Sequence, residues 1–172
     1  MLAAHALPDV LAPSLAVVFC GTAAGEKSAA RGTYYAGPGN SFWTTLYAVG
    51  LTPRQLIPAE FRTLPSFGIG LTDIAKCRSG NDAALAACDF DVPAFGEKVR
   101  RFEPRAIGFN GKKAAAVFYG YRTGDLVYGL QAAQIGTTAV WVLPSTSAAA
   151  RGSWSMEPWR AMARFANEHA LS

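Results

Sequence analysis

The sequence lacks the features that would anchor it in a membrane or cross-link it. None of its apolar stretches is long enough to span a bilayer, and residues 1–13 lack the charged start and long apolar run of a signal peptide. It has three cysteines, Cys20, Cys77 and Cys88, an odd number without C-x-x-C spacing. We therefore expect free thiols in a reducing, intracellular compartment, and three cysteines exclude a four-cysteine iron–sulfur cluster.

Charged residues are also scarce, at 16% of the chain, whereas 51% of the residues are hydrophobic. For 172 residues without an internal repeat or a low-complexity linker, we expect one domain, residues 1–172, with a substantial core. The formal net charge is +4, because 16 Lys and Arg exceed 12 Asp and Glu. This basic excess suits a polyanionic partner, although many ordinary proteins carry the same charge.

Four short apolar runs bounded by Gly, Pro or polar residues predict strands. They are Leu15–Cys20, Phe67–Leu71, Ala106–Phe109 and Ala139–Leu143. Helical spacing of apolar residues predicts helices between and after the strands. The predicted helices are Asn40–Val49, Val92–Phe102, Lys112–Phe118 and Ser155–Ala170. Strands that alternate with helices predict an α/β fold, with a parallel sheet covered on both faces and a ligand site beyond the carboxyl ends of its strands.

Four loops follow the carboxyl ends of the predicted strands, so they are the candidates for binding a ligand. They are Gly21–Gly25, Thr72–Lys76, Asn110–Lys113 and Pro144–Arg151. The first, extended to Ser28, nearly reads as a P-loop, but Glu26 replaces its last glycine and brings a carboxylate to the phosphate site. A nucleotide-binding enzyme is therefore the weaker alternative.

The other three loops each have a functional and an ordinary interpretation. Lys112 and Lys113 open a predicted helix and attract anions there, or they form a solvated helix start. Hydroxyl residues and an arginine in Pro144–Arg151 suit phosphate contacts, or they cap the next element. Asp73 is a carboxylate just after a predicted strand, hence a candidate general base or cation stabiliser, or else a helix cap.

An aromatic run, Tyr34–Trp43, follows the first strand and its glycine-bracketed turn. The turn allows a ligand to approach the backbone closely, and an aromatic ring offers a flat face for stacking. Together they indicate a pocket for a planar heterocycle next to phosphates.

Three segments in order, Val18–Gly25, Tyr35–Trp43 and Leu143–Arg151, give the sequence a specific resemblance. They resemble the mismatch-specific uracil/thymine-DNA glycosylases (the Mug/TDG family of the uracil-DNA glycosylase superfamily), whose members show V-F-C-G-I-N-P-G, F-A-H-P-x-N-x-F-W and L-P-N-P-S-G-L-S-R. The segment Gly50–Leu56 also resembles the family, so the similarity spans about residues 15–165.

The resemblance implies a three-layer α/β/α fold with a short four-stranded parallel sheet. It implies a monofunctional enzyme that flips a nucleotide out of DNA and hydrolyses the N-glycosidic bond of uracil, with other damaged or mismatched bases as further candidates. It also implies no metal or organic cofactor, and a monomer that acts on DNA in the cytoplasm, in bacteria at the nucleoid.

By the same resemblance, Tyr35 occupies the position of the aromatic residue that stacks on the flipped base. The remaining residues of the expected base pocket are Gly21, Thr22, Ala23 and Ser145. The residues expected to contact DNA are Lys112, Ser147, Ala148, Ala149, Ala150 and Arg151.

The departures from the family pattern leave the catalyst unassigned. Ala23 stands where relatives have the Asn that positions the attacking water, and Ser145 stands where they have Asn or His. Both histidines, His5 and His169, lie near the ends of the chain. We therefore expect Asp73 to be the catalyst, and the alternative is an inactive relative that only binds DNA.

The three alanines at 148–150 replace the Gly-Leu-Ser wedge that fills the gap left by a flipped base. Small side chains fill this gap poorly. We therefore expect weak discrimination of the opposite base, or tolerance of single-stranded DNA.

Overall fold

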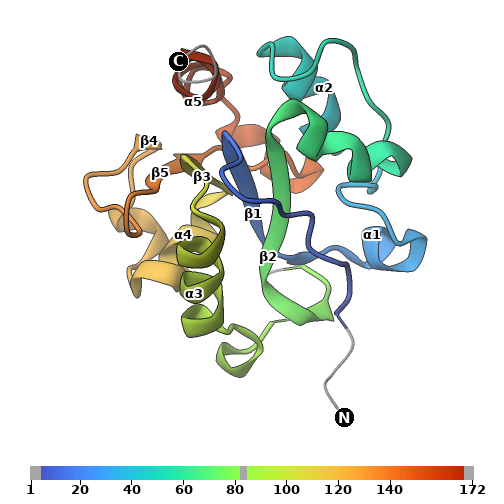
Figure 1. Cartoon of the computed structure of the whole chain (residues 1–172). Helices are drawn as coiled ribbons and strands as arrows, with labels where there is room; N and C mark the ends of the chain where they lie inside the picture. The colour runs from blue at the N-terminus through green and yellow to red at the C-terminus, as the bar shows by residue number, and fades with distance from the viewer. Residues whose placement is uncertain (1–4, 82–84, 169–172) are drawn as a thin grey trace.

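The computed structural model describes residues 5–81 and 85–168, which form a five-stranded sheet of order β2-β1-β3-β5-β4 flanked by helices (Figure 1). The strands are β1 (Val17–Ala24), β2 (Ile69–Ser79), β3 (Ala106–Asn110), β4 (Gly129–Leu130) and β5 (Ala139–Leu143). The strands β2, β1, β3 and β5 are parallel to one another, which confirms the predicted parallel sheet. The fifth strand, β4, pairs antiparallel with β5 and was not predicted, because two residues carry no apolar run.

Helices occupy the connections between the strands. The α-helices are α1 (Glu26–Arg31), α2 (Phe42–Ala48), α3 (Val92–Phe102), α4 (Lys112–Tyr119) and α5 (Glu157–Glu168). Short 3-10 helices cover Pro58–Phe67, Ala87–Asp89, Thr123–Asp125 and Ala148–Ser153. Four α-helices match the predicted ones within a few residues, and positions 169–170 of the last predicted helix lie outside the described residues. The short helix α1 was not predicted, because its six residues, EKSAAR, show no apolar periodicity.

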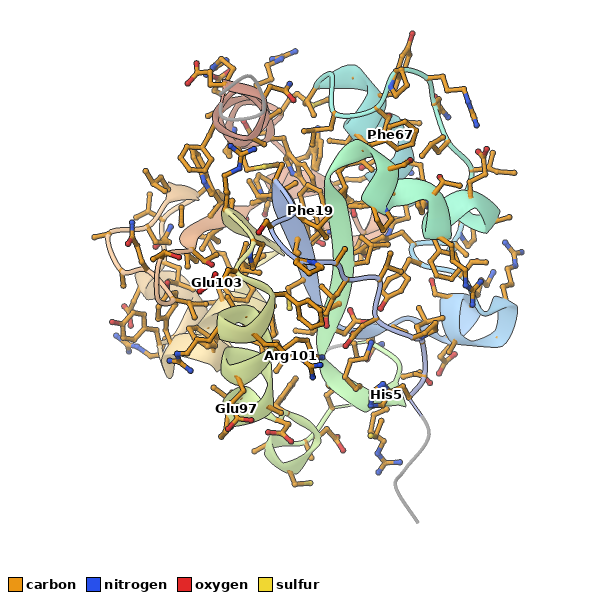
Figure 2. All side chains as sticks on the ribbon, viewed as in Figure 1. His5, Phe19, Phe67, Glu97, Arg101 and Glu103 are labelled. Atoms are coloured by element: carbon orange, nitrogen blue, oxygen red, sulfur yellow. The ribbon has the colours of Figure 1, made fainter. Side chains whose placement is uncertain are left out.

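Each of the four parallel strands sends side chains into two cores, one on either face of the sheet. Val17 and Phe19 join a core with α2 and α5, whereas Val18 and Cys20 join a core with α3 and α4. Figure 2 shows Phe19 in the middle of the molecule, where its ring stacks on Trp159 of α5 at 5.2 Å, and Glu97 at the periphery on α3. Helices on both faces confirm the predicted three-layer α/β/α arrangement.

Strands β1 and β2 are longer than the sequence predicts. Gly21 pairs with Asp73 and Ala23 pairs with Ala75, so the ladder continues through much of the segments 21–25 and 72–76. The prediction of loops there was wrong, because glycine, alanine and polar residues give no apolar run even where both strands are buried. The correction matters for function, since a strand fixes the direction of each side chain more firmly than a loop does.

The N-terminal segment runs antiparallel along the outer edge of β2. Val10 exchanges backbone hydrogen bonds with Leu71, and the Ala6 N–H donates to the Lys76 carbonyl at 2.7 Å. This segment covers an edge that would otherwise expose unpaired backbone groups. No helix in the described part of the chain is long and apolar enough to cross a membrane.

Candidate active site

A cleft of about 810 Å³ opens along the carboxyl edge of the sheet, where the sequence predicts a ligand site. Its walls come from the ends of β1, β2, β3 and β5, from the aromatic segment after α1 and from the segment before β4. Predicted site residues that line it are Asp73, Tyr35, Gly21, Thr22, Ala23, Ser145, Lys112, Ser147, Ala148, Ala149 and Ala150. The topology therefore brings all of the predicted site residues except Arg151 to one cavity.

Asp73 is buried in the wall of the cleft, with only 4% of its surface exposed. Its position on β2 places it opposite Gly21 of β1, whose backbone N–H donates a hydrogen bond to the carboxylate. A side chain at position 21 would collide with this acid, because an added Cβ would lie 2.7 Å from Asp73 Oδ1. Gly21 is therefore the residue that makes space for the carboxyl group.

Burial raises the pKa of Asp73 to about 6, because a charged carboxylate loses its hydration there. The positive charges of Lys76 and Lys98 and the Gly21 hydrogen bond lower this pKa, whereas the negative charge of Asp9 raises it. A carboxyl group with such a pKa is mostly ionised at neutral pH and can still accept a proton. This property suits a general base or a stabiliser of positive charge.

Tyr35 presents an aromatic ring close to Asp73. The ring is stacked on Phe42 with centroids 4.0 Å apart, and the hydroxyl oxygen lies 3.5 Å from the position of a Cβ on Gly21. Burial and the Asp73 charge raise the pKa of the Tyr35 hydroxyl, and the nearby Asn110 side chain opposes this shift. The hydroxyl makes no hydrogen bond of good geometry with any described residue, so a polar atom inside the cleft is left for a ligand or water.

The backbone around Tyr35 is fixed from both sides. Tyr35 has a positive φ of 52°, a conformation that costs a non-glycine residue free energy. Its neighbour Ala36 donates its N–H to Ser28 Oγ at 3.0 Å and accepts from Arg31 Nη1 at 3.1 Å. On the other side, Trp43 Nε1 donates to the Tyr34 carbonyl at 3.1 Å. These contacts hold the strained residue and its ring in place.

The same geometry removes the P-loop interpretation of Gly21–Ser28. Residues 21–24 belong to β1 and α1 begins at Glu26, so the segment forms no open loop that could wrap around phosphate. Instead, α1 supplies Ser28 and Arg31 to hold Ala36. The near match to the motif is thus explained by the positioning of the aromatic segment.

On the opposite wall of the cleft, hydrogen bonds connect the end of β3 with the segment that follows β5. Asn110 Nδ2 donates to Thr146 Oγ1 at 2.9 Å, and the Thr146 N–H donates to Asn110 Oδ1 at 3.0 Å. Farther along, the Lys112 ammonium lies 4.6 Å from the centre of the Tyr128 ring. Neither Thr146 nor Tyr128 was predicted individually as a site residue from the sequence. Tyr128 belongs to no recognisable motif. Thr146 lies in the predicted functional loop Pro144–Arg151, so the hydroxyl residues of that loop were the signal that could have identified it.

One predicted site residue falls elsewhere. Arg151 is exposed and is absent from the cleft lining; its Nη2 donates to the Gly39 carbonyl at 3.4 Å and so bridges two loops. His5 is exposed near the start of the described chain (Figure 2), and residue 169 lies outside the described residues. Among the residues that the structure describes, no group of three His, Cys, Asp or Glu side chains could hold a metal ion.

Comparison with known proteins agrees with this geometry. The family model of the uracil DNA glycosylase superfamily matches residues 8–166, so the chain belongs to this superfamily. A solution NMR structure of a candidate uracil DNA glycosylase from Methanosarcina acetivorans is similar over 97% of this chain and 98% of its own, with a TM-score of 0.61 and 24% sequence identity. At this identity the likeness shows a common fold.

Proposed function

We propose that the protein is a monofunctional DNA glycosylase of the Mug/TDG type, which hydrolyses the N-glycosidic bond of uracil in DNA with Asp73 as the catalytic residue. The observation that carries this proposal is the buried Asp73 carboxyl in the wall of the cleft. Membership of the uracil DNA glycosylase superfamily supports the reaction type. Other damaged or mismatched bases are further candidate substrates.

The sheet register supports Asp73 as a substitute for the missing asparagine at Ala23. Gly21 pairs with Asp73 and Ala23 pairs with Ala75, so Asp73 and Ala23 lie on neighbouring strands, two residues out of register. Side chains two residues apart on a strand share a face and lie roughly 7 Å apart. The neighbouring strand therefore brings a carboxyl group to the face from which relatives use an amide.

The proposed reaction begins when the flipped nucleotide enters the cleft. The bond between C1′ and the base nitrogen breaks, its electron pair leaves with the base, and positive charge develops on the sugar. The ionised Asp73 carboxylate stabilises this charge and accepts a proton from the water whose oxygen bonds to C1′. The departed base takes up the proton that Asp73 accepted, so the products are a free base and an abasic site, Asp73 is again ionised, and the reaction uses only the protein and water.

The remaining cleft residues have binding roles in this proposal. The ring of Tyr35 stacks on the flipped base, and the backbone of Gly21–Ala23 together with Ser145 surrounds its edge. Lys112 and Ser147 contact phosphates, and Ala148–Ala150 face the gap in the duplex. Outside the cleft lining, Arg151 holds the loop of Gly39, in addition to any phosphate contact from its exposed guanidinium.

A second candidate is a DNA-binding protein without activity, favoured by Ala23 and Ser145 at positions where relatives carry polar catalysts. The two candidates differ in one assay. The protein is incubated in excess over an end-labelled duplex with a single uracil, and abasic sites are then cleaved with alkali. An enzyme gives a shortened fragment, whereas a binding protein shifts the duplex in a gel and leaves it intact.

The role of Asp73 is tested in the same assay with the Asp73→Asn variant. We expect its single-turnover rate to fall by about 10²-fold or more, the usual contribution of one general base. Asp125→Asn is the matched control, because Asp125 is exposed, lies outside the cleft lining and pairs only with Arg122 in the described contacts. A wild-type rate in Asp73→Asn would remove this carboxyl from the mechanism. Duplexes with thymine or hypoxanthine then define the range of bases.

A further inference from the structure

A cluster of three charged side chains, Asp9, Lys76 and Lys98, lies near enough to Asp73 to act on it electrostatically. Lys98 Nζ lies 2.5 Å from Asp9 Oδ2, and Lys76 Nζ lies 2.9 Å from Asp9 Oδ1. Thr72 adds a hydroxyl that donates to Asp9 Oδ1 at 2.7 Å. These groups come from the N-terminal segment, β2 and α3, so the cluster ties three separate parts of the chain together.

Lys76 is held more closely than an ordinary surface lysine. Its side chain is only 10% exposed, and its ammonium donates to Tyr34 Oη at 3.2 Å and lies 5.7 Å from the centre of that ring. Tyr34 in turn donates its hydroxyl to the Pro8 carbonyl at 2.9 Å, next to Asp9. Because both Tyr34 and the N-terminal segment are fixed, the ammonium has little freedom to leave this position.

The charges in the cluster do not cancel. Two ammonium groups surround one carboxylate, which leaves one positive charge beside the buried Asp73. Among the charged groups near Asp73, Lys76 acts on it most strongly. The titratable and charged groups that interact with Asp73 are Lys76, Lys98 and Asp9, together with Cys20, Tyr34 and Tyr35.

We infer that Lys76, held in place by Tyr34 and partly neutralised by Asp9 of the N-terminal segment, is the positioning residue that keeps the Asp73 carboxyl charged and therefore reactive. Its catalytic meaning rests on the proposed function. Without Lys76, the buried carboxylate would face the negative charge of Asp9 with only Lys98 to balance both. Without Asp9, Lys76 and Lys98 would lose the carboxylate that draws their charge away from Asp73.

The two substitutions therefore have opposite effects on the pH dependence of the single-turnover rate. In the wild type the rate should rise with pH through a midpoint near 6, as Asp73 ionises. Lys76→Met should move this midpoint up by about one pH unit, so that the rate at pH 6 falls about 5-fold and the rate at pH 8 changes little. Asp9→Asn should move the midpoint to lower pH. Lys76→Arg, which keeps the charge, should restore the wild-type midpoint.

Matched controls remove the same charges far from the cluster. Arg160→Met removes an exposed positive charge on α5, and Asp125→Asn removes an exposed negative charge after Arg122. Neither residue lines the cleft, so neither control should move the midpoint. If the pH midpoint shifted equally in Arg160→Met and Lys76→Met, or in Asp125→Asn and Asp9→Asn, the effect would come from net charge and the inference would be overturned.

A second measurement does not need activity. The carboxyl carbons of the aspartates are labelled with ¹³C, Asp73 is assigned by the signal lost in Asp73→Asn, and its titration is followed by NMR without DNA. Opposite shifts of the Asp73 midpoint in Lys76→Met and Asp9→Asn would support the inference even if the wild type cleaves no uracil, in which case only the proposed function fails. An unchanged midpoint in Lys76→Met, in a protein that remains folded, would overturn the inference.

Discussion

Replacement of Asp73 by asparagine should stabilise the protein at neutral pH. The folded protein binds a proton at Asp73 with a pKa of about 6, whereas the ordinary value is 3.8. Because folding raises this pKa, Asp73 contributes most to the free energy of unfolding below pH 3.8. This contribution is lost as the pH rises through 6. The difference corresponds to about 3 kcal/mol at and above pH 7, since one pKa unit corresponds to about 1.4 kcal/mol. Asparagine has the shape of the neutral acid and avoids this cost.

Thermal unfolding measured from pH 4 to pH 8 tests this reasoning. For a chain of this length, about 3 kcal/mol corresponds to a rise of about 6–12 °C in Tm for Asp73→Asn at pH 7.5. The rise should shrink to about a fifth of this at pH 4, where the carboxyl is neutral in the folded wild type and only the unfolded-state carboxyl is still partly ionised. Asp125→Asn, at an exposed ion pair, should show no such trend. A Tm for Asp73→Asn at or below that of the wild type at pH 7.5 would refute a buried, destabilising carboxylate.

Four further predictions follow from the cleft. Gly21→Ala puts a Cβ 2.7 Å from Asp73 Oδ1, so it should destabilise the fold by about 1–3 kcal/mol and slow the single-turnover rate; an unchanged rate would mean that the carboxyl position is unimportant. Ser28→Ala leaves the Ala36 N–H without its acceptor and should cost about 1–3 kcal/mol in a chemical denaturation curve, which an unaltered midpoint would contradict. Lys112→Gln should reduce the slope of log affinity against log salt concentration for DNA by about one, measured in the Asp73→Asn background, and an equal slope would remove Lys112 from the phosphate contacts. Ala149→Leu should raise the ratio of double-stranded to single-stranded uracil cleavage, whereas strong duplex preference in the wild type would speak against a weak wedge.

The positions of the four parallel strands along the chain could be predicted because their buried centres are simple apolar runs. Val17–Cys20 and Ala139–Leu143 are buried throughout and have no polar residues, so they give the strongest signal for strands. The ends of β1 and β2 gave no such signal, because they present glycine, threonine and aspartate to a cleft. The residues that line the candidate site therefore interrupt the apolar pattern from which strands are predicted.

The candidate site could be predicted as far as its residues belong to motifs. Asp73 was singled out by its place after a predicted strand, whereas the family resemblance assigned Tyr35 and Ser145 to the base pocket, and all three line the cleft. The Asp9–Lys76–Lys98 cluster was not foreseen, since its members are 67 and 22 residues apart along the chain and meet only through the fold. The roles of Ser28 and Arg31 were likewise hidden, because they act on the backbone of Ala36.

The energetics of Asp73 favour a chemical role over a structural one. A carboxyl group that served only to hold the fold would be expected to have its charge fully paired, with a pKa below the ordinary value, as Asp9 has. Asp73 has the opposite shift, although Lys76 and Lys98 lie near enough to favour its charged form. The environment of Asp73 keeps its pKa close to neutral pH, and this lowers the free energy of unfolding. Such a loss of stability is explained if the carboxylate acts on a bound substrate.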